Sequence, residues 1–466
     1  MSKVTAEQIK ELELMIAKAK KAAAIIENYD QAKIDRLCQA VAWAVSNLQT
    51  WKVLAQEAVT ETGLGEYASK VNKRNKVRLI LRDCLRQKSV GVIEEDSAKG
   101  LVKYGKPVGV IGCLVPTTNP CLTPAGQAVF AVKARDAMIF SPHPRAKKVT
   151  AKTVEIMRLA LEKEGAPADL LQVITNPSID LTQELMQRCD LVIATGGEGM
   201  GQVPGPPAYG SGAGNSTMII DETADVKEAA LNTRISKCSD YGSGCSCDGN
   251  LVVHAAVYDE MLQALKDEGA YEATPAEAEA LKKVLWDEQG HRLPDTVAIS
   301  PQQLAAAAGF TIDSKYKFIM VIGDKIGKEH FFSSEKLTTL LTVFKYDGEF
   351  ENALTMMRAI YEVGGKGHSC GIYSFNDEHI HRLAMAAPVS RIMVRQPQNK
   401  ANAGAATNGM PATSSMGCGT WGGNIVSENI CLKHYMNTTW VARPIPEDMP
   451  SLQELFGEYY DEQLEK

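Results

Sequence analysis

One glycine-rich stretch combines residues that could do covalent chemistry. Residues 240–250 hold Cys245 and Cys247 among three glycines and lead directly into the apolar run 251–253. Glycine allows positive φ and a close approach of the backbone to a ligand, and a loop beside a strand can present a thiol to a cleft. A thiolate held there is a nucleophile toward a carbonyl carbon. The same residues are also typical of a turn with two buried, unreactive cysteines, so the rest of the chain must decide between these interpretations.

Composition limits the classes of function. A chain of 466 residues is too long for one core and is expected to form two or three domains. Its 45% hydrophobic and 23% charged residues are ordinary for a globular protein in water. The net charge of -6 argues against a nucleic-acid partner, because phosphate binding requires a concentrated basic surface.

Cysteine usage and the lack of long apolar segments predict a cytoplasmic protein. The eleven cysteines are odd in number and lack the spacing of a disulfide framework, as expected of a reduced protein. The first residues lack the apolar core of a signal peptide, and no run approaches the ~18 apolar residues that span a bilayer. Neither a C-x-x-C pair nor an H-E-x-x-H motif occurs, so we expect no metal site and no membrane partner.

Two periodicities order the chain around the cysteine stretch. Residues 6–28 and about 37–48 carry apolar side chains at helical spacing and are expected to form amphipathic helices that pack on a core. From residue 102 onward, apolar runs alternate with helical segments, which predicts a parallel α/β sheet with right-handed crossovers. Its predicted strands are 108–115, 137–140, 171–174 and 191–194, and the helices between them are 124–133, 147–164 and one through residue 186.

A second α/β unit is expected after about residue 225. A predicted helix at 226–237 leads into the cysteine stretch and then into a strand at 251–254. Ligands of parallel sheets bind at the carboxyl ends of strands, which in the first unit lead into the loops 116–120, 141–145 and 195–200. The other predicted strands of the second unit are 318–322, 340–344, 369–373 and 391–394, its other helices are 259–266 and 275–286, and 399–423 is predicted to be an extended loop.

Several of these loops carry short motifs whose order and spacing resemble one known family. They are Pro116-Thr-Thr-Asn-Pro120, Phe140-Ser-Pro-His-Pro-Arg-Ala146, Ala194-Thr-Gly-Gly197, Gly212-Ala-Gly-Asn215, Gly367-His-Ser369, and Gly417-Cys-Gly-Thr-Trp-Gly-Gly-Asn424 with Ser427-Glu-Asn429. Together they are similar to the aldehyde dehydrogenase superfamily, and specifically to its CoA-acylating branch. That branch includes the acylating succinate-semialdehyde and sulfoacetaldehyde dehydrogenases and the acylating domain of bifunctional aldehyde-alcohol dehydrogenases. The resemblance covers nearly the whole chain.

The resemblance implies a fold and its domain limits. Two Rossmann-like parallel-sheet domains are expected: a dinucleotide-binding domain at 1–97 and 107–228, and a catalytic domain at 229–432. Residues 98–106 and 433–445 are expected to form a small two-stranded flap that joins subunits into a homodimer or homotetramer. Without the resemblance, these two segments are only plausible edge strands.

The resemblance also assigns the nucleophile. It maps the catalytic cysteine onto Cys245, whose thiolate would attack an aldehyde and form a thiohemiacetal. The oxyanion of that intermediate needs donors already in place, and the resemblance places the Asn119 side chain and the Cys245 backbone N–H there. His368 is a candidate polar partner in the pocket, and a neutral loop histidine with satisfied hydrogen bonds is the alternative. Cys247 is interpreted as a buried small side chain.

The fate of the acyl-cysteine separates the branches of the family. Hydrolytic members carry a glutamate in a Glu-Leu-Gly-Gly pattern that activates water, whereas the corresponding residues 210–215 read Gly-Ser-Gly-Ala-Gly-Asn here. Without that general base a thiol can compete with water, and coenzyme A is the implied acceptor. The implied reaction interconverts an aldehyde, CoA and NAD(P)⁺ with an acyl-CoA and NAD(P)H. A hydrolytic dehydrogenase, which would form free acid without CoA, is the alternative.

The dinucleotide, NADP or NAD, is assigned to loops of both domains. The resemblance implies binding by Thr117, Thr118, Ser141, Pro142, His143, Gly196, Gly197 and Glu335. It also implies binding by Arg145: His143 beside Arg145 could accept a 2′-phosphate, and a solvated turn explains Arg145 equally well. Residues 200–207 depart from the family, because their prolines cannot continue the helix whose N-terminus would face the pyrophosphate. This departure supports a second hypothesis: a protein with the same fold and little catalysis, kept for assembly or for binding acyl-CoA.

The identity of the aldehyde is the feature of the reaction that the sequence determines least. Arg391 could pair with the carboxylate or sulfonate of an acidic aldehyde such as succinate semialdehyde or sulfoacetaldehyde, and Thr420 is a second candidate contact. The alternative for Arg391 is a family residue whose guanidinium is bound to backbone carbonyls. The sequence therefore predicts a short-chain aldehyde without fixing which one.

Overall fold

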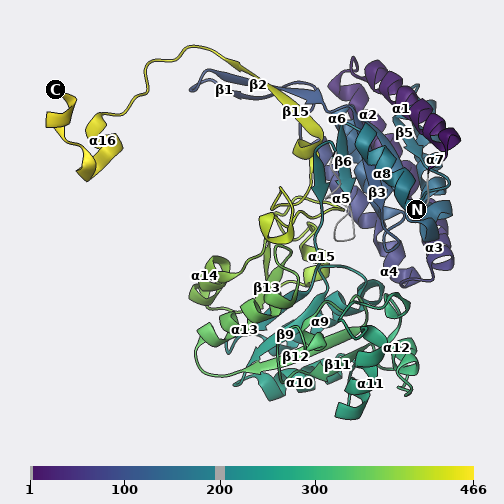
Figure 1. Ribbon diagram of the computed structural model, residues 1–466, viewed down its shortest axis with the longest axis vertical. Helices are drawn as coiled ribbons and strands as arrows, with labels where there is room; N and C mark the ends of the chain where they lie inside the picture. The colour runs from purple at the N-terminus through teal and green to yellow at the C-terminus, as the bar shows by residue number, and fades with distance from the viewer. Residues whose placement is uncertain (1–3, 195–204) are drawn as a thin grey trace.

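The computed structural model describes residues 4–194 and 205–466 and places them in two lobes (Figure 1). The first lobe holds a five-stranded parallel sheet in the order β5-β4-β3-β6-β7. All six residues of β3 and of β4 are buried, as expected of strands covered by helices on both faces. The strands are β3 (Val110–Val115), β4 (Ala137–Pro142), β5 (Leu171–Val173), β6 (Leu191–Ala194) and β7 (Ala208–Gly210).

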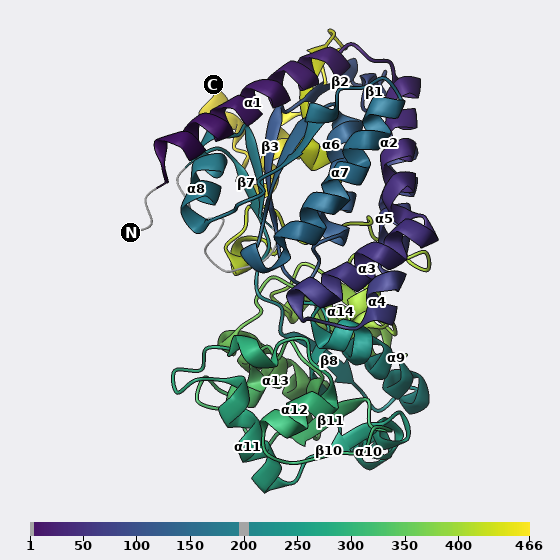
Figure 2. The ribbon, with the colours of Figure 1, turned by 90° about the vertical axis from the view of Figure 1, so that its right-hand side faces the viewer.

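Helices cover both faces of this sheet (Figure 2). α1 (Ala6–Ile26) and α8 (Ile179–Arg188) lie on one face, and α6 (Leu122–Ala134) and α7 (Lys147–Lys163) lie on the other, with α2 (Gln31–Ser46) behind them. α6 is buried almost all round because the sheet contacts one side of it and α2 and α5 contact the other, which is typical of a core helix. Three more helices, α3 (Leu48–Thr62), α4 (Tyr67–Asn72) and α5 (Arg74–Leu85), complete this lobe.

The second lobe holds a seven-stranded parallel sheet in the order β10-β11-β12-β9-β8-β13-β14. Leu251 and Val253 pack in the core under α9 and α10, while Val252 packs in the core under α13, so β9 is apolar on both faces. The strands are β8 (Ser216–Ile220), β9 (Asp248–His254), β10 (Ala270–Glu272), β11 (Phe318–Ile322), β12 (Leu340–Tyr346), β13 (Cys370–Tyr373) and β14 (Ile392–Val394). The helices are α9 (Val226–Cys238), α10 (Tyr258–Asp267), α11 (Pro275–Leu285), α12 (Pro301–Ala307), α13 (Phe350–Val363), α14 (Asp377–Ala386) and the short α15 (Gln398–Ala401).

The chain enters the second sheet earlier than we predicted. β8 pairs with β9 and β13, so residues 216–228 belong to the second lobe and the crossover lies at 211–215. The domain limit at 228 therefore corrects to a position before Ser216. The error arose because β8 follows a glycine-rich segment and begins with the polar Ser216 and Thr217, which mask the strand pattern.

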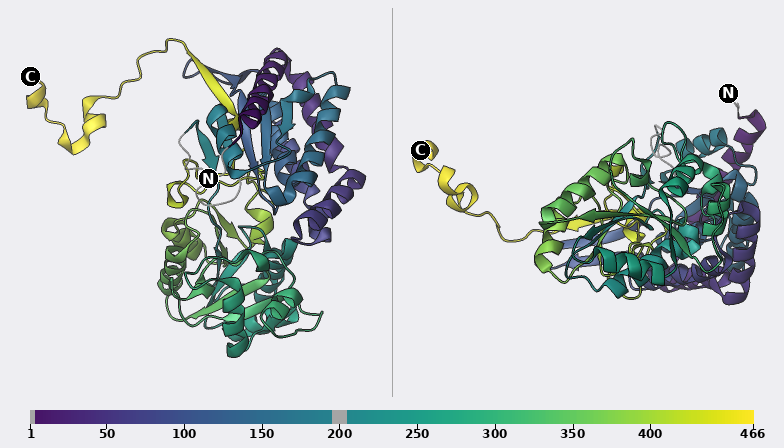
Figure 3. Two further views of the ribbon diagram at one scale, coloured as in Figure 1. Left: turned by 45° about the vertical axis from the view of Figure 1, so that its right-hand side comes forward. Right: turned by 90° about the horizontal axis from the view of Figure 1, so that it is seen from below.

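The small flap has three strands rather than the two that we expected. β1 (Gly91–Asp96) pairs antiparallel with β2 (Leu101–Pro107), which pairs antiparallel with β15 (Met436–Ala442). The sequence pattern did not predict β1, because half of its residues are acidic and no apolar alternation indicates a strand. Beyond β15 the chain runs away from the body to α16 (Leu452–Phe456) and the C-terminus (Figures 1 and 3).

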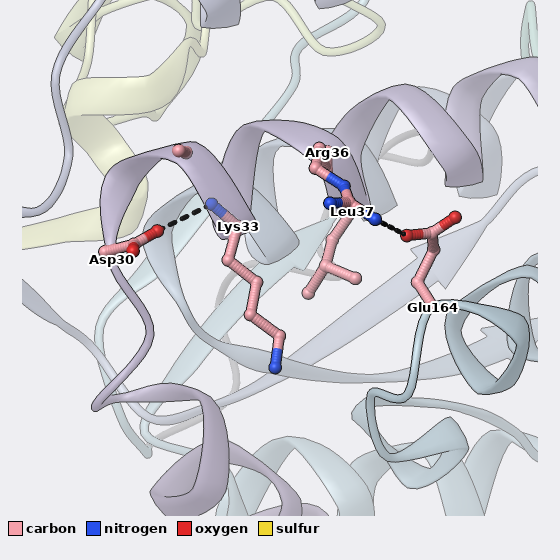
Figure 4. Close-up of a pocket in the computed structure, with 6 residues that line it drawn as sticks. Asp30, Lys33, Arg36, Leu37 and Glu164 are labelled. Carbon is pink, nitrogen blue, oxygen red and sulfur yellow. Dashed lines mark hydrogen bonds and ion pairs between the residues drawn. The ribbon is translucent and has the colours of Figure 1, made fainter.

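Within residues 4–194 and 205–466, no helix is long and apolar enough to cross a membrane. A hollow of about 240 Å³ lies beside the start of α2 (Figure 4). There the Asp30 side chain accepts the Lys33 N–H and caps the helix, and Arg36 pairs with Glu164 at 2.9 Å. An ion pair as exposed as this one contributes little to stability, and none of the predicted site residues lines the hollow.

Candidate active site

A cavity of about 1680 Å³ lies between the two lobes. The carboxyl ends of β3 and β4 line it from the first lobe, and the segments that precede β8, β9 and β12 line it from the second. The ligand-binding edge of one parallel sheet therefore faces the amino ends of the strands of the other. The volume exceeds the roughly 300–1,000 Å³ of an ordinary small-molecule pocket, so a dinucleotide or CoA fits beside a small aldehyde.

Cys245 lines this cavity and is half-buried. The turn before it is tight, because Asp240 and Tyr241 adopt left-handed backbone angles with φ of 50° and 53°. Such angles are uncommon outside glycine and indicate a loop held by its surroundings. All eleven cysteines of the chain are free thiols, so Cys245 is not joined to Cys247. The interpretation of residues 240–250 as a turn with two inert cysteines is therefore not supported for Cys245.

His368 lies against the Cys245 thiol, with His368 Nε2 3.0 Å from Cys245 Sγ. The strand order explains the contact, because Cys245 precedes β9, His368 precedes β13, and β8 lies between these two strands. Gly367 has a φ of 85°, and a Cβ there would lie 1.9 Å from the Cys418 carbonyl oxygen, so glycine is required beside the histidine.

The hydrogen bonds around His368 favour one tautomer. When Ser216 Oγ donates to the Cys245 carbonyl oxygen at 3.4 Å, it accepts at the 2.7 Å contact with Ser369 Oγ. Ser369 Oγ then accepts from His368 Nδ1–H at 2.8 Å. This direction of donation leaves the lone pair of Nε2 facing the thiol, which is the arrangement of a general base.

Burial sets the protonation states of this pair. Burial raises the pKa of the Cys245 thiol, and the nearby Glu335 and Cys418 raise it further, while Arg391 lowers it. Burial and the Arg391 charge lower the pKa of His368 to about 3. Near neutral pH the cysteine is therefore a thiol and the histidine is neutral, so nucleophilic attack requires proton transfer from Sγ to Nε2.

Asn119 lines the cavity from the loop after β3. Its Oδ1 accepts from Lys73 Nζ at 2.6 Å, while its Nδ2 has a long contact of 3.5 Å with Thr118 Oγ1. The amide hydrogens of Nδ2 are therefore the free end of this side chain, as the expected oxyanion donor requires.

The glycine-rich residues 210–215 pack directly against Cys245 at Gly214. A Cβ on Gly214 would lie 1.9 Å from the Cys245 carbonyl oxygen and 2.3 Å from Glu335 Oε1. The Gly214 N–H donates to Glu335 Oε1 at 3.0 Å, which fixes that carboxylate at the cavity wall. No side chain of any size can replace this glycine without moving the cysteine loop.

The residues expected to hold the dinucleotide lie at the carboxyl ends of the first sheet. Thr117, Thr118, Ser141, Pro142 and His143 line the cavity, as does Glu335 on the opposite side. Their position at the strand ends fits a dinucleotide. Gly196 and Gly197 lie outside the described residues, as do residues 200–204 of the segment that departs from the family.

Arg145 does not line the cavity. Its Nη2 donates to the Thr62 carbonyl oxygen at 3.0 Å, and its backbone N–H donates to His143 Nδ1 at 3.1 Å. This favours the structural explanation of Arg145 over a role as a 2′-phosphate ligand.

Neither of the two residues assigned to the substrate lines the cavity. Arg391 is 3% exposed, and its guanidinium donates to the carbonyl oxygens of His368 and Gly417 and to Asn429 Oδ1. A guanidinium occupied in this way supports the loops beneath the site and cannot pair with an incoming anion. Thr420 is exposed and does not line the cavity. Both assignments are therefore corrected.

Sequence reasoning missed three groups of this site: Lys73, the carboxylate of Asp240, and Ser369 as the residue that orients His368. The described residues also bring together one set of possible metal ligands, Asp221, Glu222 and His379. Asp221 and His379 already form a 2.8 Å pair, and the set does not line the cavity.

The site and the fold together define a class of protein. A cysteine whose thiol contacts a histidine, facing loops that suit a dinucleotide across one cavity, is compatible with an oxidoreductase that binds its aldehyde covalently. Residues 1–274 match the model described as "Aldehyde dehydrogenase family".

Comparison with individual proteins narrows this class. The chain is 44% identical over 455 residues to a sulfoacetaldehyde dehydrogenase of Acholeplasma sp, covering 96% of this chain and 94% of that protein. It is 39% identical to a sulfoacetaldehyde dehydrogenase (acylating) of Bilophila wadsworthia, covering 95% and 97%. The crystal structure of an acetylating aldehyde dehydrogenase from Geobacillus thermoglucosidasius superposes with a TM-score of 0.92 at 33% identity, covering 97% of this chain and 100% of that one. The chain belongs to the aldehyde dehydrogenase family, as an acylating aldehyde dehydrogenase and thus an NAD(P)-dependent oxidoreductase.

Proposed function

We propose that this protein converts a short-chain acidic aldehyde, CoA and NAD(P)⁺ into the acyl-CoA and NAD(P)H through an acyl-cysteine at Cys245. The observation that carries the proposal is the 3.0 Å contact between His368 Nε2 and Cys245 Sγ at the wall of the cavity. This contact favours catalysis over the hypothesis of a protein kept only for assembly or for binding acyl-CoA.

The proposed reaction has two halves, acylation of Cys245 and transfer of the acyl group to CoA. His368 Nε2 takes the thiol proton, Cys245 Sγ forms a bond to the aldehyde carbon, and Asn119 Nδ2 and the Cys245 N–H donate to the resulting oxyanion. The dinucleotide, held by Thr117, Thr118, Ser141, Pro142, His143 and Glu335, supplies the acceptor for the hydride when it is bound. Cys245 is then left as a thioester. In the second half His368, after losing its first proton to solvent, takes the proton of the CoA thiol, whose sulfur displaces Cys245 as a thiolate.

The thioester is proposed to be transferred to CoA rather than to water. Residues 210–215 contain no carboxylate, and the Glu335 carboxylate is bound to the Gly214 N–H. Unassisted water is a poor nucleophile, whereas a thiol needs only one proton removed.

Sulfoacetaldehyde is the first candidate substrate and succinate semialdehyde is the second. The relatives that share 44% and 39% of their residues with this chain are sulfoacetaldehyde dehydrogenases. Since Arg391 is occupied by carbonyl oxygens, the acidic group of the substrate must be bound by other residues of the cavity. NAD⁺ and NADP⁺ are both candidates, and the occupied Arg145 favours NAD⁺.

The test follows nucleotide reduction with each aldehyde, with NAD⁺ and NADP⁺ measured separately, in the presence and absence of CoA. The proposal expects acyl-CoA as product, dependence on CoA for turnover, and no turnover in Cys245→Ala. Free acid formed without CoA would instead identify a hydrolytic enzyme. A full rate in Cys245→Ala would contradict the proposed nucleophile.

We also propose that a second copy of this chain covers the flap. Six of the seven β15 residues are exposed, and so are Leu455, Phe456 and Leu464 of the segment that leaves the body. A free strand edge and exposed apolar side chains are both typical of a subunit contact. Light scattering at micromolar concentration is expected to show a homodimer or homotetramer that deletion of residues 444–466 weakens, and a monomeric full-length chain would contradict it.

A further inference from the structure

One lysine connects the two halves of the site. Lys73 Nζ donates to Asn119 Oδ1 at 2.6 Å and to Asp240 Oδ2 at 2.6 Å, with a weaker contact to the Thr118 carbonyl oxygen at 3.4 Å. Lys73 stands between α4 and α5 in the first lobe, and Asp240 lies five residues before Cys245 in the second. The ammonium group therefore contacts both the expected oxyanion donor and the cysteine loop.

The chemistry of an ammonium group fixes the orientation of the amide. Lys carries three donors and no acceptor, so the atom of Asn119 that faces Nζ must be the carbonyl oxygen. A flipped amide would point N–H groups at N–H groups, which is repulsive. Lys73 thereby holds Nδ2, the donor end of Asn119, in the orientation that an oxyanion needs, before the oxyanion forms.

Asp240 in turn holds Lys73. Its side chain is 2% exposed, and it accepts from Lys70 Nζ at 3.1 Å, from the Glu66 N–H at 2.8 Å and from the Ser243 hydroxyl at 3.1 Å as well as from Lys73. A buried carboxylate with this many donors is rigid. Because Asp240 adopts its left-handed angles in the turn before Cys245, the same cluster also sets the position of the cysteine loop.

We propose that Lys73, anchored by Asp240, is a positioning residue that orients the Asn119 amide toward the oxyanion of the thiohemiacetal. The inference rests on the proposed role of Asn119 in the proposed function. Lys73 is not assigned a contact with the reacting atoms and acts only through Asn119.

A double-mutant cycle on kcat tests this, using Lys73→Met, Asn119→Ala and the double variant. Asn119→Ala is expected to lower kcat by about 10²–10³-fold, and Lys73→Met by about 10–100-fold, because the amide loses its fixed orientation. The double variant is expected to match Asn119→Ala within about threefold, since Lys73 has nothing left to orient. The matched control is Lys152→Met, which removes an exposed lysine paired with Glu57 in the same lobe and should leave kcat unchanged.

A readout on the ligand-free protein separates positioning from general damage. Alkylation of Cys245 by iodoacetamide should keep its rate in Lys73→Met, because Lys70, the Glu66 N–H and the Ser243 hydroxyl still hold Asp240 and with it the cysteine loop. Lys73→Met should also fold, since Asp240 keeps Lys70 as a partner. If Lys73→Met fails to fold, Asn119→Asp gives an independent test, because it keeps an oxygen for Lys73 and loses Nδ2. Asn119→Asp should be as inactive as Asn119→Ala, and it should unfold at a higher temperature.

Three results would overturn the inference. They are an unchanged kcat in Lys73→Met, losses that multiply in the double variant, and an Asn119→Asp protein that unfolds at a lower temperature than Asn119→Ala. Failure of the proposed function is distinguishable from these, because it would appear as full activity in Asn119→Ala and Cys245→Ala themselves.

Discussion

Replacing His368 by glutamine removes the base and preserves a hydrogen-bond acceptor near the thiol. The wild-type geometry places Nε2 3.0 Å from Cys245 Sγ, and the low pKa of about 3 keeps the imidazole neutral at every pH from 5 to 9. Burial raises the pKa of the thiol, so thiolate is scarce unless a base accepts its proton. A positioned general base contributes about 10²–10⁴-fold, and because a carbonyl can accept a hydrogen bond but not the proton, His368→Gln should lose about 10²–10³-fold in kcat/KM for the aldehyde. That loss corresponds to roughly 3–4 kcal/mol of transition-state stabilisation.

Two assays check this prediction. Steady-state kcat/KM at pH 7.5 measures the loss, and iodoacetamide alkylation of Cys245 between pH 6 and 10 measures thiolate formation directly. In both proteins alkylation should accelerate with pH through pH 9, because burial raises the thiol pKa, and the variant should require the higher pH. Ser369→Ala, which removes only the acceptor of Nδ1–H, should show a smaller loss of about tenfold. A His368→Gln enzyme within about threefold of wild type would refute the assignment of the base.

Three further predictions concern residues around the nucleophile. Gly214→Ala should lower kcat by more than about 10²-fold, because its Cβ would overlap the Cys245 carbonyl oxygen. The control Gly409→Ala, whose Cβ would have no atom within 4 Å, should leave kcat unchanged. Equal kcat values in the two variants would contradict the packing argument. Cys247→Ala should keep kcat within about threefold of wild type in a turnover assay, since Cys247 is buried and does not line the cavity. An inactive Cys247→Ala protein would show that this thiol takes part in the reaction. Burial raises the pKa of Asp240, but the Lys73 and Lys70 charges outweigh it and hold the pKa at about 2, below its ordinary 3.8. The lowered pKa stabilises the folded protein by about 2 kcal/mol, a contribution that is complete above pH 5 and lost as pH falls toward 2. In urea unfolding, the difference in free energy of unfolding between wild type and Asp240→Asn should therefore narrow from pH 5 to pH 2. A difference that stays constant would contradict the ion pairing of Asp240.

The sequence predicted the parts of the fold that depend on local pattern. The runs 137–140 and 191–194 are apolar without interruption, and they form the buried strands β4 and β6. β8 was missed because its polar first residues leave only a short apolar run. Periodicity measures burial along one segment and carries no information about which strands become neighbours.

The same limit applies to the site. Cys245, Asn119 and His368 could be named through motifs, but the contact between Cys245 and His368 spans 123 residues and depends on β8 lying between β9 and β13. Lys73 stands among other basic residues and reads as part of a solvated helix face. Its function appears only when the fold brings a buried Asp240 and an amide oxygen to the same nitrogen.

The most direct test of the account is mass spectrometry of Cys245 during a single turnover. Protein is mixed with sulfoacetaldehyde and NAD⁺ in the absence of CoA, and the active-site peptide is analysed before and after CoA is added. We predict one equivalent of NADH, a thioester on Cys245 that outlasts the mixing time, and transfer of its acyl group to CoA when CoA is added. Release of free acid before CoA is added, or an acyl group on any other residue, would contradict it.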